Sequence, residues 1–258
     1  MEERKLEEIK HYDEDAKNWH GGSSDIQGVD VMMMAGYREI YRILESEVAG
    51  KTVLDYGCGH GMHSVSIARF GGKVTGVDLS EESLKIAKGR TEKEGFGGHI
   101  QFVAGDCEAL PFADQSFDIV FDGGTFSSLD IEKAFSEIAR VLKPGGLLIG
   151  IETLGHNPLA NFKRWINKKR GTRTGWAADH IMKMFDLDRA KKYFDILETR
   201  FFHFFSMFAF PFRNMPGGKM LFRALDKIDN VVLKIPFLKR YSFKIVFVFS
   251  AKGVSPKL

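Results

Sequence analysis

The sequence predicts an α/β fold with a mostly parallel sheet, because short apolar runs alternate with helical stretches between residues 51 and 153. The runs read KTVLDY, KVTGVDL, IQFVAG, FDIVF and GGLLIGIETL. The helices predicted between them cover residues 62–70, 80–94 and 130–142. The first run leads into a glycine-rich turn, VLDYGCGHG, and such turns let a backbone approach a ligand closely.

The ends of the helices carry local signals. Ser80, followed by Glu81 and Glu82, predicts an N-cap with acids in the first turn, and Lys143-Pro144-Gly145-Gly146 predicts the end of the third helix. Two or three helices are expected in residues 1–50, which we interpret as an N-terminal lid segment ahead of a domain over 51–258.

The alternation stops after Leu154. Residues 155–190 are interpreted as an insertion above the sheet, because GHNPLANFKRWINKKRGTRTGWAADH holds six Lys and Arg residues and no acid before Asp179. FDILETRFFHFFSMFAF, residues 194–210, and YSFKIVFVFSAK, residues 241–252, predict two more strands. A second insertion, residues 211–240, is expected between them, with a basic and apolar helical stretch.

Composition excludes several classes of protein. No apolar run approaches the roughly 20 residues of a membrane-spanning helix, and the N-terminus is charged, so we expect a cytoplasmic protein. Only Cys58 and Cys107 are present, which suits a reducing compartment, and no metal ligand set is predicted. Residues 1–150 carry 16 Lys and Arg against 26 Asp and Glu, whereas residues 151–258 carry 21 against 8. The second half therefore favours an anionic partner or simply a solvated basic face.

The glycine turn discriminates between two kinds of nucleotide. A dinucleotide fold needs a third glycine three residues after the second, where this chain has Met62, and a helix N-terminus free for a pyrophosphate. Asp55 beside the turn would repel a phosphate and attract a cation, and Asp78 after the next strand suits the hydroxyls of a ribose. The residues therefore predict an adenosine that carries a positive charge.

Several motifs resemble those of class I S-adenosylmethionine-dependent methyltransferases of the small-molecule, type 11 kind. VLDYGCGHG is similar to the first motif of that family, VTGVDLSEESL to the second, FVAGDCEALPFADQSFDIVF to the third and fourth, and ARVLKPGGLLIGIE to the sixth. The resemblance covers about residues 50–153. It implies a Rossmann-like, seven-stranded, mostly parallel sheet of order 3-2-1-4-5-7-6, with the last strand antiparallel and a helical lid insertion.

The resemblance also implies a set of cofactor contacts. The turn would run along the methionine part of S-adenosylmethionine, Asp78 would accept hydrogen bonds from the ribose, and Asp106 would accept one from the adenine. After transfer the product would be S-adenosylhomocysteine. The cofactor-binding residues implied in this way are Tyr12, Asp55, Gly57, Cys58, Gly59, Gly61, Asp78, Leu79, Asp106, Cys107, Asp122 and Gly123. Tyr12 belongs to HYDEDAKNWH, which is similar to a segment that closes over the cofactor in the family, and simple packing remains the alternative for it.

The candidates on the acceptor side are less distinctive. Methyl transfer needs alignment and exclusion of water, and it needs a base only if the acceptor is protonated. Many relatives have a His after the fourth strand, where this chain reads DGGTFSSLD, so any base at that position is in doubt. His156 and His180 are the candidate catalytic residues, with helix capping as the alternative for His156. Packing is favoured over proton transfer for His60 and His63. The candidate substrate contacts are Phe126, Asn157 and Arg173.

The Phe-rich second half bears on the partner. RFFHFFSMFAFPFR has adjacent Phe pairs that a strand cannot bury on one face, so some rings are expected to line a pocket or another surface. A peripheral contact with anionic lipid and a homodimer interface both explain them, and the preferred acceptor is a lipophilic or acidic small molecule. Nucleic acid is not favoured, because KRWINKKRGTRTGW stands without an RNA-binding module. RNA or protein methylation, a non-catalytic cofactor-binding protein and a nicotinamide oxidoreductase remain the alternatives.

Overall fold

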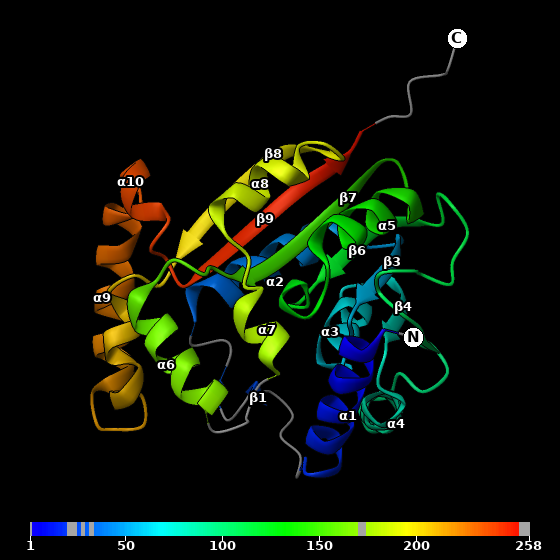
Figure 1. Cartoon of the computed structure of the whole chain (residues 1–258), viewed down its shortest axis with the longest axis horizontal. Helices are drawn as coiled ribbons and strands as arrows, with labels where there is room; N and C mark the ends of the chain where they lie inside the picture. Colours follow the sequence, from blue (N-terminus) through cyan, green and yellow to red (C-terminus); the bar gives the residue numbers. More distant parts are fainter. Residues whose placement is uncertain (1, 20–24, 27–28, 31–33, 170–173, 253–258) are drawn as a thin grey trace.

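The computed structural model describes residues 2–19, 25–26, 29–30, 34–169 and 174–252. Its centre is a seven-stranded sheet that crosses the molecule diagonally in Figure 1, with helices on both faces. The strands are β3 (Thr52–Tyr56), β4 (Lys73–Asp78), β5 (Gln101–Ala104), β6 (Phe117–Asp122), β7 (Leu142–Thr153), β8 (Phe194–Phe202) and β9 (Lys244–Ala251). Their order is β5-β4-β3-β6-β7-β9-β8, and β9 runs antiparallel to both of its neighbours. Counted within this sheet the order is 3-2-1-4-5-7-6, which confirms the predicted fold class.

The helices between the first five strands follow the predicted boundaries closely. They are α3 (Met62–Arg69), α4 (Glu81–Lys93) and α5 (Ile131–Val141). Ser80 caps α4 by accepting the N–H of Ser83 at 3.0 Å, as predicted. Asp130 caps α5 in the same way, because its carboxylate accepts the N–H groups of Glu132 and Lys133.

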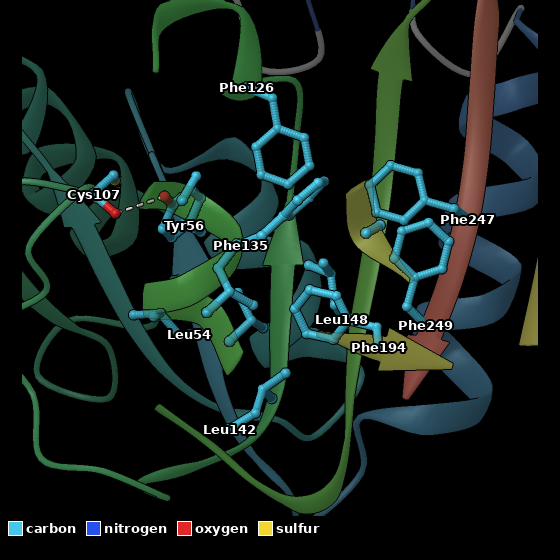
Figure 2. Close-up of a cluster of buried hydrophobic side chains, with 14 of the residues drawn as sticks. Leu54, Tyr56, Cys107, Phe126, Phe135, Leu142, Leu148, Phe194, Phe247 and Phe249 are labelled. Carbon is cyan, nitrogen blue, oxygen red and sulfur yellow. Dashed lines mark hydrogen bonds between the residues drawn. The ribbon is translucent and has the colours of Figure 1, made fainter. Parts of the chain in front are cut away.

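Two apolar layers hold the sheet between the helices. On one face α5 and α8 (Met184–Ala190) cover the strands, and Figure 2 shows Phe126, Phe135, Phe194, Phe247 and Phe249 gathered there. Pairs of these rings approach closely, with centroids 5.3 Å apart for Phe126 and Phe135 and 4.7 Å for Phe247 and Phe249. On the other face α2 (Ala35–Glu47) and α3 pack against the sheet. Burial of apolar surface on both faces is typical of a sheet whose strands are mostly parallel.

The described stretches of residues 1–50 contain two helices with different roles. α2 belongs to the core, because Tyr37, Ile40 and Leu44 are buried against the sheet. α1 (Glu3–Lys17) lies outside the sheet and packs on α4 instead. The segment also contains a two-stranded hairpin of β1 (Asp25–Ile26) and β2 (Val29–Asp30), which the sequence did not suggest. A lid role is therefore open to α1, whereas α2 is part of the scaffold.

The insertion after β7 contacts α1. It contains α6 (Pro158–Lys169) and α7 (Gly175–Asp179), and α7 packs on η2 (Phe126–Ser128), the 3₁₀ turn after β6. Thr174, at the start of α7, donates a hydrogen bond to Glu8 of α1, and the guanidinium of Arg4 lies 4.4 Å from the ring centre of Trp176. α1 and α7 therefore meet beside the carboxyl end of β6.

The strand predicted for residues 194–210 is wrong beyond Phe202. The chain leaves the sheet at His203, whose φ of 65° is left-handed, and continues as the 3₁₀ helix η3 (Ser206–Phe212). The carboxylate of Asp229 accepts the N–H groups of Phe204, Phe205 and Ser206, so these groups cannot continue the ladder. Asp229 comes from α9 (Gly218–Val232), which α10 (Pro236–Lys239) follows.

Replacement of Gly150 tests the packing of the first layer. A Cβ atom at Gly150 of β7 would overlap the ring of Phe247, so Gly150→Ala is expected to lower the free energy of unfolding by about 2–3 kcal/mol. Gly89 lies within α4 and has no atom within 4 Å of the position of its Cβ. Gly89→Ala is the matched control and should raise the same free energy by about 0.5–1 kcal/mol. Urea unfolding measures both, and equal stability of the two variants would contradict this packing.

Candidate cofactor and acceptor site

The turn between β3 and α3 depends on its glycines. Gly57, Gly59 and Gly61 have φ values of 65°, 49° and 73°, a region that other residues rarely adopt. A side chain at Gly57 would overlap Thr125. At Gly59, by contrast, no atom lies within 4 Å of the position of a Cβ, so the backbone of the turn borders open space there. A ligand can therefore approach the main chain at Gly59.

Asp78, the last residue of β4, joins the glycine turn to the next turn. Its Oδ2 accepts the N–H of Gly59 at 2.8 Å, and its Oδ1 accepts the N–H of Ser80 at 2.9 Å. Each carboxylate oxygen retains a further lone pair, which suits two adjacent hydroxyl donors such as those of a ribose. Burial raises the pKa of Asp78, although the two N–H groups act in the opposite direction. Leu79 follows and is half-buried beside this carboxylate.

Asp55 lies under the turn and is fully buried. It accepts a short hydrogen bond of 2.5 Å from the hydroxyl of Ser64 in α3. Burial raises the pKa of Asp55 from its ordinary value of 3.8 to about 7. In the unliganded protein this carboxyl therefore favours folding at low pH, and that contribution is lost as the pH rises from about 4 to about 7. A cation bound near Asp55 would favour its ionised form.

The third motif places Asp106 and Cys107 at the carboxyl end of β5. Asp106 accepts the N–H of Glu108 at 2.8 Å, and Lys5 of α1 lies 2.6 Å from its other oxygen. The carbonyl of Cys107 accepts the hydroxyl proton of Tyr56 at 2.7 Å, as Figure 2 shows. Burial raises the pKa of both cysteine thiols, Cys58 and Cys107, well above the ordinary value, so neither is a thiolate near neutral pH.

α1 contacts the loops that follow four strands of the sheet. Lys5 pairs with Asp106 after β5, and Asp13 accepts a 2.5 Å hydrogen bond from the hydroxyl of Ser80 after β4. Tyr12 shares a 2.8 Å hydrogen bond with Ser128 after β6. Trp19, just beyond the helix, lies 5.1 Å from the ring of His60 in the glycine turn. α1 therefore lies across the carboxyl edge of the sheet, with Tyr12 at one of its anchoring points.

Comparison with known proteins indicates which kind of domain forms this edge of the sheet. Residues 54–150 match the family model described as "Methyltransferase domain". Over these residues the chain is therefore similar to that family, in agreement with the resemblance of its motifs. The cofactor of this family is S-adenosylmethionine.

Two curated relatives and one solved structure are similar to this domain. The sterol 24-C-methyltransferase of Pneumocystis carinii is 38% identical over 105 residues, which are 40% of this chain and 28% of that protein. The demethylmenaquinone methyltransferase of Lactococcus lactis is 34% identical over 150 residues, 55% of this chain and 59% of that one. The chain thus matches about a quarter to three fifths of the length of these relatives. The geranyl diphosphate C-methyltransferase of Streptomyces coelicolor, solved with Mg²⁺, geranyl diphosphate and S-adenosylhomocysteine, has a TM-score of 0.63 at 16% identity, over 97% of this chain and 98% of that chain.

The residues of the methyltransferase domain fit this cofactor. Asp78 offers two acceptor atoms for the ribose hydroxyls, and the open backbone at Gly59 leaves room beside them. Asp55 supplies a buried carboxyl group under the turn, and a bound cation would favour its ionised form. At Asp106 an adenine amino group would share the carboxylate with Lys5.

A buried polar group lies beyond the glycine turn, at the carboxyl ends of β6 and β7. Oδ1 of Asp122 accepts the N–H groups of Thr125 and Gly124, but its Oδ2 is buried without a hydrogen-bond partner. Burial, together with the charge of Glu152, raises the pKa of Asp122 well above its ordinary range. Glu152 accepts the N–H groups of Phe126 and Thr153 at 2.7 and 3.0 Å. Lys244, at the start of β9, is also buried, and its charge acts on Asp122.

Three aromatic side chains, Tyr37, Tyr41 and His63, form an aromatic wall near this polar group. His63 lies beside the backbone of Gly123, and its Nδ1 is 3.0 Å from the hydroxyl of Tyr41. Tyr37 stacks parallel to the His63 ring and also faces the Lys244 ammonium. Burial, with a smaller effect of Lys244, lowers the pKa of His63 to about 4, so the imidazole is neutral. The packing role expected for His63 agrees with this geometry.

The other predicted acceptor residues have structural partners. His156 accepts the N–H of Met184 at 3.2 Å, and Asn157 caps α6 by accepting the N–H of Ala160 while its amide donates to the carbonyl of Tyr241. His180 is exposed and stacks on Trp176 with ring centres 3.6 Å apart. The ring of Phe126 is 1% exposed and lies in the core (Figure 2). Arg173 lies outside the described residues. Contact of these five residues with an acceptor stays a prediction.

Glu152, Lys244, Tyr37 and Tyr41 were missed from the sequence. A signal was present for two of them, because Glu152 and Lys244 are single charges within the apolar runs LLIGIET and YSFKIVFVFS. A charge inside a buried strand requires a partner or a ligand. Tyr37 and Tyr41 carried no such signal, since an aromatic residue on an amphipathic helix is most often a core residue.

A second buried group brings together His203, Asp226 and Asp229, whose ligand atoms lie within 4.8 Å of one another. Hydrogen bonds within the protein account for it. Nε2 of His203 accepts the N–H of Gly36 at 3.3 Å, and Nδ1 faces Asp226 at 3.2 Å. Asp229 accepts three backbone N–H groups and the Ser206 hydroxyl, so the group joins η3 to α9 and α2.

The raised pKa of Asp55 predicts a pH-dependent preference for the charged cofactor. As the pH rises from about 6 to about 8, the affinity for S-adenosylmethionine should rise by about three- to tenfold relative to that for S-adenosylhomocysteine, whose sulfur is neutral. Calorimetric titration of both ligands at each pH measures the ratio. Asp55→Asn keeps an acceptor for Ser64 and should make the ratio independent of pH. A ratio that is flat in the unchanged protein would contradict the assigned role of Asp55.

Proposed function

We propose that the protein transfers a methyl group from S-adenosylmethionine to a small lipophilic acceptor whose polar end lies at Asp122, Glu152 and Lys244. The observation that carries this proposal is the buried polar group beyond the glycine turn, with one carboxyl oxygen left without a partner. Unpaired polar atoms are costly to bury, and a bound ligand supplies the missing partner.

The names of the similar proteins support a lipophilic acceptor. They act on a sterol, on demethylmenaquinone and on geranyl diphosphate, according to those names. The aromatic wall of Tyr37, Tyr41 and His63 beside the polar group suits an acceptor of this kind. Lys244 suits an acidic or strongly polar substituent on it.

The chain contributes alignment and a proton acceptor. When bound, S-adenosylmethionine supplies a methyl group activated by positive sulfur. The glycine turn and Asp78 fix the cofactor end, and α1 and α7 cover the edge of the sheet and exclude water. Glu152 is held by two backbone N–H groups and takes the proton that the acceptor releases when its nucleophilic atom gains the methyl group. Asp122, whose pKa burial raises, lies at the end of the neighbouring strand β6.

Replacement of Glu152 tests this assignment. Glu152→Gln keeps an oxygen that can accept the N–H of Phe126 but cannot take a proton, so kcat should fall by about 100-fold or more. The affinity for S-adenosylhomocysteine should change by less than about threefold, because Glu152 lies on the acceptor side. Glu45→Gln, on the exposed face of α2, is the matched control and should leave both quantities unchanged. Full turnover by Glu152→Gln would remove Glu152 from the mechanism.

The acceptor class is tested with labelled methyl donor. The protein is incubated with it and with separated lipid, RNA, protein and water-soluble small-molecule fractions of a cell extract. The proposal predicts label in the lipid fraction. Label confined to RNA or protein would contradict the acceptor class, and cofactor binding with no label in any fraction would favour a non-catalytic binding protein.

A further inference from the structure

The end of the molecule formed by η3, α9 and α10, at the left of Figure 1, exposes many large apolar side chains. Six of them are between 48% and 78% exposed: Phe212, Met215, Met220, Val231, Ile235 and Phe237. Exposed apolar groups in one contiguous segment of the chain indicate a surface that meets another phase or partner. In the part of the chain that the structure describes, no helix is both long and apolar enough to cross a bilayer.

α9 has exposed apolar side chains on the face turned away from the protein. Phe222, Asp226 and Asp229 face the protein interior. Met220, Ile228 and Val231 recur at helical spacing on the opposite side and are exposed. A surface helix of a soluble domain ordinarily places polar residues there. The outward stripe therefore has no partner within the described part of this chain.

The charges that this segment presents to solvent are all positive. Residues 204–240 contain seven Lys and Arg residues and two acids. Both acids, Asp226 and Asp229, are buried and bonded to groups of the protein. Arg223, Lys227 and Lys234 lie along one flank of the apolar stripe of α9, by their helical spacing. An apolar stripe flanked by cations is typical of helices that lie on anionic membranes.

A basic groove borders the same flank, between α2, β8 and α9. It encloses about 590 Å³. Its charged lining consists of Arg38, Arg42, Arg200, Lys234 and Lys239 with one carboxylate, Glu39. Glu39 pairs with both Arg42 and Arg200, Glu198 pairs with Arg200, and Asp226 pairs with Arg38, so five cations face three carboxylates and a positive excess remains. An anionic lipid headgroup fits this chemistry, because phosphate accepts hydrogen bonds from several cations at once.

We propose that η3, α9 and α10 dock on the surface of a membrane that contains anionic lipid, with a phosphate-bearing headgroup in the groove beside α9. A second copy of the chain fits this surface less well, because a symmetric dimer would place two positive faces against each other. The proposal stands on this surface alone and does not depend on methyl transfer.

Vesicle flotation of the full chain tests the proposal. Vesicles of phosphatidylcholine with phosphatidylglycerol should carry the protein upward, and phosphatidylcholine alone should not. Raising the NaCl concentration from about 0.05 M to about 0.5 M should lower the partition coefficient of the protein between vesicles and buffer by about tenfold or more. The double variant Lys234→Gln/Lys239→Gln should reduce it by about tenfold or more at low salt, and Val231→Asp/Phe237→Asp should abolish it.

Matched controls distinguish docking through this surface from a general effect of net charge and from unfolding of the variants. Lys51→Gln/Lys73→Gln removes two exposed cations, one just before β3 and one at the first residue of β4, and Leu6→Asp changes a 54% exposed apolar residue of α1. Both controls should float like the unchanged protein, and all variants should retain its thermal unfolding midpoint. Three results would overturn the proposal: no flotation with either vesicle, equal flotation of the unchanged protein and both groove and stripe variants, or a dimer in solution that Val231→Asp/Phe237→Asp dissociates while lipid binding is absent.

Discussion

The site depends on one carboxylate, that of Asp78, which accepts the backbone N–H groups of Gly59 and Ser80. These two hydrogen bonds fix the turns after β3 and β4 relative to each other at the carboxyl edge of the sheet. The turn has glycines with positive φ values and no side chains, so a ligand can approach its main chain at Gly59. An adenosine that carries a positive charge and no phosphate suits this arrangement, because the buried carboxyl group of Asp55 lies under the turn, where a pyrophosphate would be repelled.

The buried residues of the scaffold are apolar, whereas those of the site are polar. Aromatic and aliphatic layers on both faces of the sheet hold the strands in register. Toward the carboxyl edge the interior becomes polar, with Asp122, Glu152 and Lys244 at the ends of β6, β7 and β9. Burying these groups lowers the free energy of unfolding. The raised pKa values of Asp55 and Asp122 reflect the cost of burying a charged carboxylate. A protein retains such residues where a ligand needs them.

Local sequence signals were sufficient where local interactions determine the structure. The strand order, the Ser80 cap and the glycine turn follow from motifs within residues 50–153, and the structure agrees with each. The strand expected to continue to residue 210 failed because Asp229, distant in sequence, binds the N–H groups of Phe204 to Ser206. Glu152 and Lys244 lie on neighbouring strands only once β9 pairs with β7, so their proximity was not visible in the sequence. The pairing of Lys5 with Asp106 likewise depends on the position of α1.

Calorimetric titration with S-adenosylhomocysteine and with NADH tests the cofactor selectivity of this edge most directly, since both ligands carry an adenosine and only NADH carries a diphosphate. We expect one-to-one binding of S-adenosylhomocysteine, weakened by about tenfold or more in Asp78→Ala, and no heat from NADH. Tight NADH binding that excludes S-adenosylhomocysteine would contradict the role given to Asp55 and Asp78.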